Sequence, residues 1–405
     1  MIFKIAWRNI WRNKLRSLVV MISISLGLWA GIFGTSLANG LNKQRIDSVV
    51  DNQLSHFQIH NPAFKENFDV SATIDNPEMV MQQLQERSDI KAVCSRTIVN
   101  GMVSSSITSK GVQIKGIVPE QEAEVIDLES FLTEGEYFGS KSRTPSILLG
   151  SSLAEKLNVG LRKKLVLKFQ DKNSEVVAAA FKVVGLYKTN DTRNDEMTVY
   201  VEQKDLNRIL NVPNASHEIA VLLNDIEVLE ELTPELKSEF PTLLVENWKE
   251  IFPGLDSANE ISKSANMLLL IIIMLALCFG ILNTMLMAVL ERVREFGMLM
   301  AVGLNKTKVF IMIMLETIIL MLTATPIGLA LAWLTVYYFS ENGIDFSAQS
   351  EGFGSMGIAP IVYPYLSYDY YPKVILLVVI AAILSAIYPA IKAIKLNPAE
   401  SIRKL

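Results

Sequence analysis

The histidines are the first residues whose type and spacing could support chemistry. His56 and His60 are four residues apart, which is the spacing of two zinc ligands on one face of a helix. The segment HFQIH alternates, however, and therefore favours a strand with both imidazoles pointing out from one face of a sheet. His217 is far from both in the sequence. We predict no metal site.

A nucleotide site and an acyl-transfer site can also be tested against the sequence. Residues 135–142 read GEYFGSKS, which has some likeness to a phosphate-binding loop. That loop requires an adjacent glycine and lysine and glycines that are further apart, so this segment is interpreted as a turn. No set of Ser, His and Asp has the local context of a catalytic triad. We predict no catalytic residue and no cofactor in this chain.

Glu316 is a carboxylate inside an apolar stretch, about two helical turns beyond Lys308. An ionised side chain at such a depth in a membrane costs roughly 3 kcal/mol unless it is paired. A proton relay would need a second acid or histidine in a span, and none is present, so a hydrogen-bonding role between helices is favoured. Asn283 is interpreted in the same way. Pro326 and Gly328 should kink the helix that contains Glu316, or allow it to pack closely on a neighbour.

The positions of the apolar residues predict a membrane protein. The chain has 405 residues, 50% hydrophobic and 20% charged, with a mean hydropathy of +0.30. Four stretches are long enough to cross a hydrocarbon core of about 30 Å as helices. They are residues 18–41, 267–290, 309–339 and 373–394. The net charge of -4 predicts no nucleic-acid partner.

Lysine and arginine placement predicts the orientation of these spans. Basic residues are concentrated in residues 1–17, in the link 291–308 and in the tail 395–405, whereas residues 340–372 contain none. The positive-inside rule then places both termini and the link in the cytoplasm, and residues 42–263 and 340–372 outside. Residues 1–17 are predicted to form an amphipathic helix along the inner membrane interface, or else a simple extension of the first span. The first apolar run exceeds that of a cleaved signal peptide, so it should remain attached.

Residues 42–263 are predicted to form a large mixed α/β domain outside the cytoplasm. Alternation or β-branched content indicates strands at 56–60, 97–103, 112–118, 164–169, 176–187, 197–201 and 218–223. Helices are expected from Asn76-Pro77 to about Arg87, at 153–157 after a capping box of Ser152 and Glu155, from near Glu202, and from Trp248 directly into the second span. Cys94 and Cys278 lie in different regions and should not pair.

The link between the second and third spans has a pattern suited to binding a soluble partner. Helical spacing places Arg292, Glu295 and Leu299 on one side. Val293, Phe296, Met300 and Leu304 lie on another side, and Gly297 and Gly303 allow close approach and a turn. An amphipathic helix with both charge signs could dock into a cleft of a soluble protein. Periodicity alone favours an ordinary interfacial link equally.

This segment resembles the coupling helix of the MacB/LolCE/FtsX group of ABC transporter permeases, whose pattern is close to E-R-x-R-E-[IF]-G-x-L-x-A-x-G. The matching residues are Glu291, Arg292, Arg294, Glu295, Phe296, Gly297, Leu299, Ala301 and Gly303. Met300 departs from the arginine that is frequent in the family. AWRNIWRNKLRS near the N-terminus, LETIIL around Glu316 and YPAIKAIKLNPAESIRKL from Tyr388 are similar to other segments of these permeases.

The resemblance implies four transmembrane helices and an outer domain with a MacB-like porter part and a second lobe. It implies a pair of permeases, identical or different, and a separate ATPase of the LolD/MacB type that binds ATP and Mg and docks on residues 291–306. Because an N-terminal helix begins at residue 1, we expect the ATPase to be another chain. Such permeases transmit ATP-driven motion to their outer domains.

SHFQIHNP and LLGSSLAEKLNVG are most similar to the lipoprotein-releasing branch, although VGLRKK departs from its usual V-G-D. The leading hypothesis is extraction of lipoproteins from a bacterial inner membrane to a periplasmic carrier. Candidate acyl-chain contacts near the outer span ends are Leu37, Leu41, Met267 and Leu268. The alternatives are an efflux permease for antibiotics or peptides and a regulator of a periplasmic hydrolase. A receptor or enzyme that is merely anchored in the membrane would leave the link unexplained.

Overall fold

The computed structural model describes residues 2–12, 14–50, 54–138, 144–349, 352, 359–368 and 370–395. The chain divides into two compact units. The membrane unit consists of Met1–Lys43, Glu260–Asp345 and Ile361–Leu405, and the outer domain consists of Gln44–Asn259 and Phe346–Pro360.

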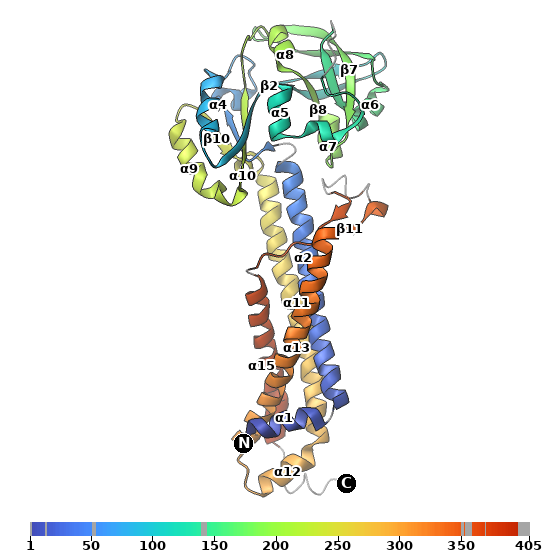
Figure 1. The fold of residues 1–405 in the computed structure, drawn as a ribbon, viewed down its shortest axis with the longest axis vertical. Coiled ribbons are helices and arrows are strands. Elements are labelled where there is room, and N and C mark those ends of the chain that lie inside the picture. Colours follow the sequence, from blue (N-terminus) through green and yellow to red (C-terminus); the bar gives the residue numbers. More distant parts are fainter. Residues whose placement is uncertain are drawn as a thin grey trace. The chain divides into compact units, whose positions relative to one another are not determined.

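Long helices form the membrane unit (Figure 1). Its elements are α1 (Ile2–Arg12), α2 (Lys14–Val49), α11 (Pro253–Glu291), α12 (Val293–Ala301), α13 (Lys306–Asn342), α15 (Tyr370–Ile394) and the strand pair β11 (Ile344–Asp345) and β12 (Ile361–Val362). Within the described residues, four helices are long and apolar enough to cross a membrane, namely Ser17–Val49, α11, α13 and α15. The prediction of four spanning helices is therefore confirmed. The helices exceed the apolar stretches because the polar residues at their ends also remain helical.

Small residues allow α2 to pack closely on its neighbours. A Cβ atom at Gly27 of α2 would lie 2.2 Å from the Leu277 side chain of α11. The hydroxyl of Ser25 in α2 donates a hydrogen bond of 2.9 Å to the Ala324 carbonyl of α13. Small residues with short hydroxyl side chains are the usual means by which membrane helices approach each other. The expected close packing at Gly328 is confirmed, because a Cβ atom there would lie 2.9 Å from the Ser25 carbonyl oxygen.

The outer domain contains one mixed ten-stranded sheet. The strand order is β10-β1-β9-β2-β3-β8-β5-β7-β4, and β6 pairs with β2 and β7. β3 and β5 run parallel to β8 and β7 respectively, and the other pairs are antiparallel. The strands are β1 (Phe57–His60), β2 (Ile90–Ser104), β3 (Ser109–Ile117), β4 (Leu132–Gly135), β5 (Ser146–Gly150), β6 (Lys164–Gln170), β7 (Val176–Tyr187), β8 (Thr198–Glu202), β9 (Glu218–Leu223) and β10 (Leu244–Asn247).

Short helices cover this sheet. They are α3 (Pro62–Asn67), α4 (Pro77–Gln85), α5 (Pro119–Val125), α6 (Ser151–Leu157), α7 (Thr192–Met197), α8 (Gln203–Leu210), α9 (Leu229–Glu239) and α10 (Trp248–Ile251). Separate apolar clusters lie beneath them. One cluster contains Phe57, Leu84 and Trp248, and another contains Leu157, Phe181 and Leu206. The domain thus has distinct apolar cores on a common sheet.

All seven predicted strands are present, but several details of the prediction are wrong. His56 and His60 are both buried rather than pointing out, because β1 is paired on both edges and covered on both faces. Ser152 is not a cap, since α6 begins at Ser151 with Gly150 at its N-cap position. The helix from Trp248 is interrupted at Phe252, before α11 begins.

The other predicted helix starts were partly correct. Asn76 occupies the N-cap of α4 but has a left-handed backbone with φ of 50° and makes no side-chain cap, and the helix ends at Gln85. The helix expected near Glu202 begins at Gln203. The glycine-rich turn begins at Gly135, and its residues 139–143 lie outside the described residues. Cys94 and Cys278 are both free thiols, as predicted.

Candidate functional site

The link between the second and third long helices folds into the short helix α12. Phe296 is 1% exposed and belongs to the apolar cluster of the membrane unit, and Gly297 is also buried. Met300 and Leu304 pack against the same cluster, as their spacing predicted. Leu299 packs there too, although it was expected on the opposite side. α12 is therefore seated on the ends of the long helices by its apolar face.

The opposite side of α12 faces solvent. Met298 is 54% and Val302 90% exposed, and Glu291, Arg294, Ala301 and Gly303 are exposed as well. Beyond α12 the backbone turns at Gly303, whose φ is 103°, a conformation that glycine adopts without strain. The Asn305 side chain then accepts a hydrogen bond from the Thr307 amide and caps α13. The turn and the cap fix where α12 ends.

Arg292 precedes α12 and turns inward onto the third long helix. Its side chain is only 12% exposed. Its Nη1 lies 3.1 Å from both carboxylate oxygens of Glu316, and its Nε donates a hydrogen bond of 2.9 Å to Glu295. The guanidinium also lies over the Phe296 ring, 5.1 Å from its centre. Arg292 therefore pairs within the membrane unit instead of pointing to solvent.

α1 completes this arrangement from the other end of the chain. The side-chain amide of Asn9 donates a hydrogen bond of 2.6 Å to the Glu316 carboxylate. Arg12 forms an ion pair with Glu295. We call Asn9, Arg12, Arg292, Glu295 and Glu316 the charge network. Its two cations and two carboxylates balance, and Glu316 forms hydrogen bonds with residues of other segments, as its structural interpretation predicted.

A small cavity of about 30 Å³ lies within the charge network. Its lining includes Asn9, Ser17, Arg292 and Glu316. A volume of this size holds about one water molecule, so the cavity is too small for an organic ligand. The charge network can join helices and position them, but it offers no room for a substrate.

The candidate acyl-chain residues lie where α2 and α11 are joined by a polar contact. The Asn266 amide of α11 donates a hydrogen bond of 2.7 Å to Asn39 of α2. Leu37 and Leu41, two residues to either side of Asn39, are half-buried. On α11, Met267 and Leu268 follow Asn266 and are 46% and 59% exposed. The exposed pair on α11 leaves an apolar surface at this level of the helix.

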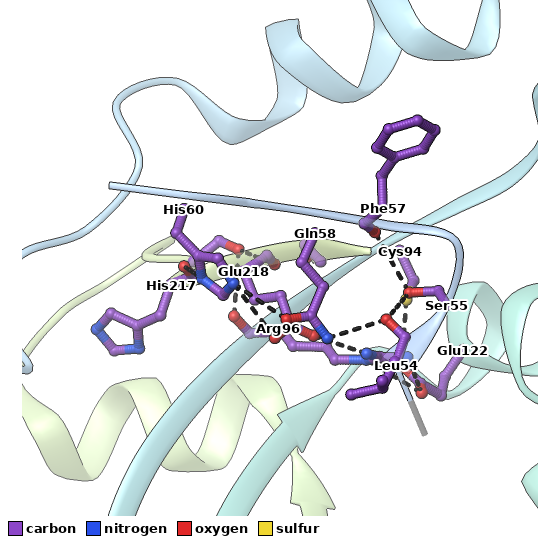
Figure 2. A network of polar contacts seen from close by, with 12 residues as sticks. Leu54, Ser55, Phe57, Gln58, His60, Cys94, Arg96, Glu122, His217 and Glu218 are labelled. Carbon is purple, nitrogen blue, oxygen red and sulfur yellow. Dashed lines mark hydrogen bonds and ion pairs between the residues drawn. The ribbon is translucent and has the colours of Figure 1, made fainter. Parts of the chain in front are cut away.

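A second polar cluster is buried in the outer domain (Figure 2). Arg96 is fully buried and donates to Glu122 through Nε and Nη2, and to Glu218 through Nη1 at 2.7 Å. The Cys94 thiol donates to Glu122 at 3.2 Å, and burial raises the pKa of this thiol well above its ordinary value. A buried thiol with a raised pKa is a poor nucleophile. This cluster therefore joins β2, β9 and α5.

The histidines are held by backbone groups. His60 Nδ1 donates to the His217 carbonyl at 2.9 Å, and His56 Nδ1 accepts from the Leu223 amide at 2.8 Å. His217 Nδ1 accepts from the Ile98 amide at 3.0 Å. Burial lowers the pKa of all three imidazoles. Among the described residues no group of His, Cys, Asp or Glu could hold a metal ion.

Four membrane-spanning helices, an α/β domain inserted after the first of them and a short amphipathic helix after the second define an ABC transporter permease. Two family models match the sequence: the MacB-like periplasmic core domain over residues 17–239 and the FtsX-like permease C-terminal domain over residues 267–398. The first match alone covers more than half of the chain. The chain therefore belongs to the MacB/FtsX family of ABC transporter permeases, and its outer domain is a MacB-like periplasmic domain.

Curated relatives match the chain along nearly its whole length. The lipoprotein-releasing system transmembrane protein LolC of Neisseria meningitidis is 24% identical, over 97% of this chain and 95% of the relative. LolE of Haemophilus influenzae is 22% identical, over 98% of both chains. The solved periplasmic region of MacB from Actinobacillus actinomycetemcomitans is 16% identical and covers 52% of this chain and 97% of that one, with a TM-score of 0.35. Permeases of this family work with ABC ATPases.

Proposed function

We propose that this chain is the non-catalytic permease subunit of an ABC transporter that extracts lipoproteins from the inner membrane and passes them to a periplasmic carrier. A separate ATPase of the LolD/MacB type, which binds ATP and Mg, docks on α12. A second permease, identical or different, completes the transporter. Both termini and α12 lie in the cytoplasm. The observation that carries this proposal is α12 itself, which is seated by one face and exposed on the other.

The two faces of α12 divide the nine motif residues by role. The exposed residues Glu291, Arg294, Ala301 and Gly303 form the surface that meets the ATPase, together with Met298 and Val302. Arg292, Phe296, Gly297 and Leu299 point inward and hold α12 in place. Glu295 is partly exposed and contributes through its ion pairs with Arg292 and Arg12. A helix with this division can transmit a push from the ATPase, because its buried side is packed against the ends of the long helices.

The substrate part of the proposal depends on the outer ends of α2 and α11. Acyl chains of a lipoprotein would contact Leu37, Leu41, Met267 and Leu268, where the exposed α11 residues offer apolar surface beside the Asn39 to Asn266 hydrogen bond. The LolC and LolE relatives, which match along nearly the whole chain, support lipoproteins as the substrate class. The chemical reason is general, since a lipid-anchored protein can leave a bilayer only if its chains find another apolar surface.

ATPase docking is tested by copurification from native membranes. Val302→Asp should lower the amount of bound ATPase about tenfold, because it places a charge on the apolar C-cap residue of α12, which is 90% exposed. Lys308→Glu is the matched control, since it changes charge at an exposed residue of the next helix, and it should retain the ATPase. If the unaltered chain carries no ABC ATPase, the transporter class itself is wrong.

The substrate is tested by mass spectrometry of molecules bound to the purified complex and by stimulation of ATP hydrolysis in liposomes. Lipoproteins should copurify and stimulate hydrolysis. Stimulation by macrolides or free peptides alone would replace the lipoprotein proposal with efflux. Copurification of a periplasmic hydrolase without any transported molecule would identify a regulatory subunit instead.

A further inference from the structure

We propose that α1 is part of the ATPase docking port, and that Glu316 is the positioning residue which fixes α12 through Arg292. This inference rests on the proposed function, because it assigns a role to helices that surround the ATPase-binding surface. The motif that identified α12 does not include α1, and interfacial position was the role expected for that helix. The contacts of α1 in the membrane unit indicate an additional role.

The charge network forms a closed ring through three helices. Asn9 and Arg12 are three residues apart and therefore lie on one face of α1. Asn9 binds Glu316 of α13, while Arg12 binds Glu295 of α12. Arg292 then joins both carboxylates. Displacing α12 from α13 would thus break contacts to α1 as well.

The ring has an exposed half and a buried half. The side chains of Arg12 and Glu295 are 51% and 37% exposed, whereas those of Arg292 and Glu316 are 12% and 9% exposed. A buried ion pair is far more sensitive to the loss of one partner than an exposed pair, because the remaining charge stays without compensation. Glu316 and Arg292 therefore set the position of α12, and Arg12 adds α1 to the same rigid group.

α1 is also fixed to the first span. Ser17 at the start of the spanning part of α2 is buried, and its hydroxyl donates a hydrogen bond of 2.7 Å to the Ile10 carbonyl of α1. Ile10 is 6% exposed and belongs to the same apolar cluster as Phe296. Motion of α12 therefore reaches α2 through α1, and α13 through Glu316. A helix that only rested on the membrane surface would not have these contacts.

Charge reversal on α1 tests the first half of the proposal in the complete permease with its ATPase. Arg12→Glu should reduce permease-stimulated ATP hydrolysis roughly fivefold to tenfold, because it opposes Glu295. Adding Glu295→Gln should restore part of the activity, because it removes the repulsion with the carboxylate introduced at position 12 while its amide oxygen can still accept the hydrogen bond from Arg292. Arg8→Glu is the matched control, since Arg8 is an exposed arginine of the same helix outside the ring, and it should remain within about twofold. Equal losses from both reversals, or no rescue, would overturn the role of α1.

Glu316 is tested by separating ATPase binding from stimulation. Glu316→Gln preserves volume and the hydrogen bond from Asn9 but removes the charge that faces Arg292. The ATPase should still copurify, because the exposed face of α12 is unchanged, while stimulated hydrolysis falls about tenfold. Normal stimulation with Gln at this position would show that Glu316 does not position α12.

A cross-link distinguishes failure of this inference from failure of the proposed function. Arg12→Cys and Glu295→Cys, in a chain without Cys278, should be bridged by a short bis-maleimide in native membranes whether or not an ATPase is present. Because α1 and α12 should move together, forming the bridge should change stimulated hydrolysis by no more than about twofold relative to the same double-cysteine chain before bridging. Efficient bridging that blocks hydrolysis would refute the rigid group. If the bridge forms but the unaltered chain never binds an ABC ATPase, the proposed function alone is refuted.

Discussion

Gly328 of α13 lies directly against the backbone of Ser25 in α2. A Cβ atom at position 328 would lie 2.9 Å from the Ser25 carbonyl oxygen and 3.0 Å from its Cα, so no flexible side chain can move aside. Gly328→Ala should separate the two helices and lower the stability of the membrane unit by about 1 to 3 kcal/mol. Thermal unfolding of the purified chain in detergent measures this loss.

The control for Gly328 is Gly34 of α2, where a Cβ atom would meet nothing within 4 Å. Gly34→Ala should keep or slightly raise the melting temperature, because alanine has the higher helix propensity. If both substitutions lower the melting temperature equally, close approach at Gly328 is not the cause.

The Arg96 to Glu122 pair should dominate the stability of its part of the outer domain. Both side chains are fully buried. Arg96→Met leaves Glu122 and Glu218 without their cation, and should cost about 3 to 5 kcal/mol of unfolding free energy. Cys94 is a natural reporter, because its thiol is buried within the same cluster and becomes reactive only when the cluster opens. The labelling rate of Cys94 by a maleimide, in a chain without Cys278, should rise strongly.

Arg87→Met is the matched control for Arg96. Arg87 also binds two glutamates, Glu235 and Glu239, but its side chain is 24% exposed and those of its partners are 62% and 35% exposed. Exposed pairs contribute about 1 kcal/mol or less, so Cys94 labelling should change little. Similar labelling rates in the two variants would show that burial does not strengthen the Arg96 pair.

His56 should make the outer domain sensitive to acid. Burial, aided by the positive charge of Lys91, lowers the pKa of His56 from 6.5 to about 4. As the pH falls, His56 is therefore protonated in the unfolded chain before it is protonated in the folded chain. The free energy of unfolding falls by about 3 kcal/mol as the pH drops from about 6.5 to 4. His60 and His217 act in the same direction, since burial lowers the pKa of both. His56→Asn retains an acceptor for the Leu223 amide and should remove the His56 contribution.

Asp195 should act in the opposite direction over part of this range. Burial raises the pKa of Asp195 from 3.8 to about 6, against hydrogen bonds from Thr189 that lower it. As the pH rises, Asp195 loses its proton in the unfolded chain before it does so in the folded chain, so the free energy of unfolding falls between about pH 3.8 and 6. Urea unfolding of the full chain at a series of pH values, followed by tryptophan fluorescence, separates the two effects when His56→Asn and Asp195→Asn are each compared with the unaltered chain. Parallel pH profiles for His56→Asn and the unaltered chain would contradict the His56 prediction.

Local pattern in the sequence predicted most of the elements, and the missed strands have a physical explanation. β7 alternates along twelve residues, which a period of two identifies. β5 reads SILLG and is buried on both faces, so it has no alternation, and such a run cannot be distinguished from helix by period. β4 has only four residues and is largely exposed. β10 is equally short and follows α9 closely.

The candidate site was only half predictable, because its motif is local and its partners are distant. The residues of α12 are consecutive, and their spacing indicated the helix and its apolar side. Asn9 and Glu316 are separated by 307 positions, and no local pattern in the sequence pairs them. Arg96 was missed for a related reason. A single arginine within a strand gives no sign of the two carboxylates, from α5 and β9, that compensate its burial.

Gly303 lies in the turn between α12 and α13, and should control the orientation of α12 relative to α13. Its φ of 103° is strained for any residue with a Cβ atom, although a Cβ atom there would meet nothing within 4 Å. Gly303→Ala therefore adds backbone strain of about 1 to 2 kcal/mol without a steric clash. The chain can relieve this strain by reorienting α12, so ATPase copurification should fall while the thermal stability of the long helices stays nearly unchanged.

Gly280 of α11 is the matched glycine for this test. A Cβ atom there would also meet nothing within 4 Å, but the backbone is helical and its φ is not positive. Gly280→Ala should preserve both ATPase binding and stability, because its backbone is helical and it lies within the span α11, away from the exposed face of α12. If Gly303→Ala binds the ATPase as well as Gly280→Ala does, the left-handed turn after α12 has no part in docking. If both variants lose the ATPase, the loss comes from introducing alanine anywhere in the membrane unit and not from the turn.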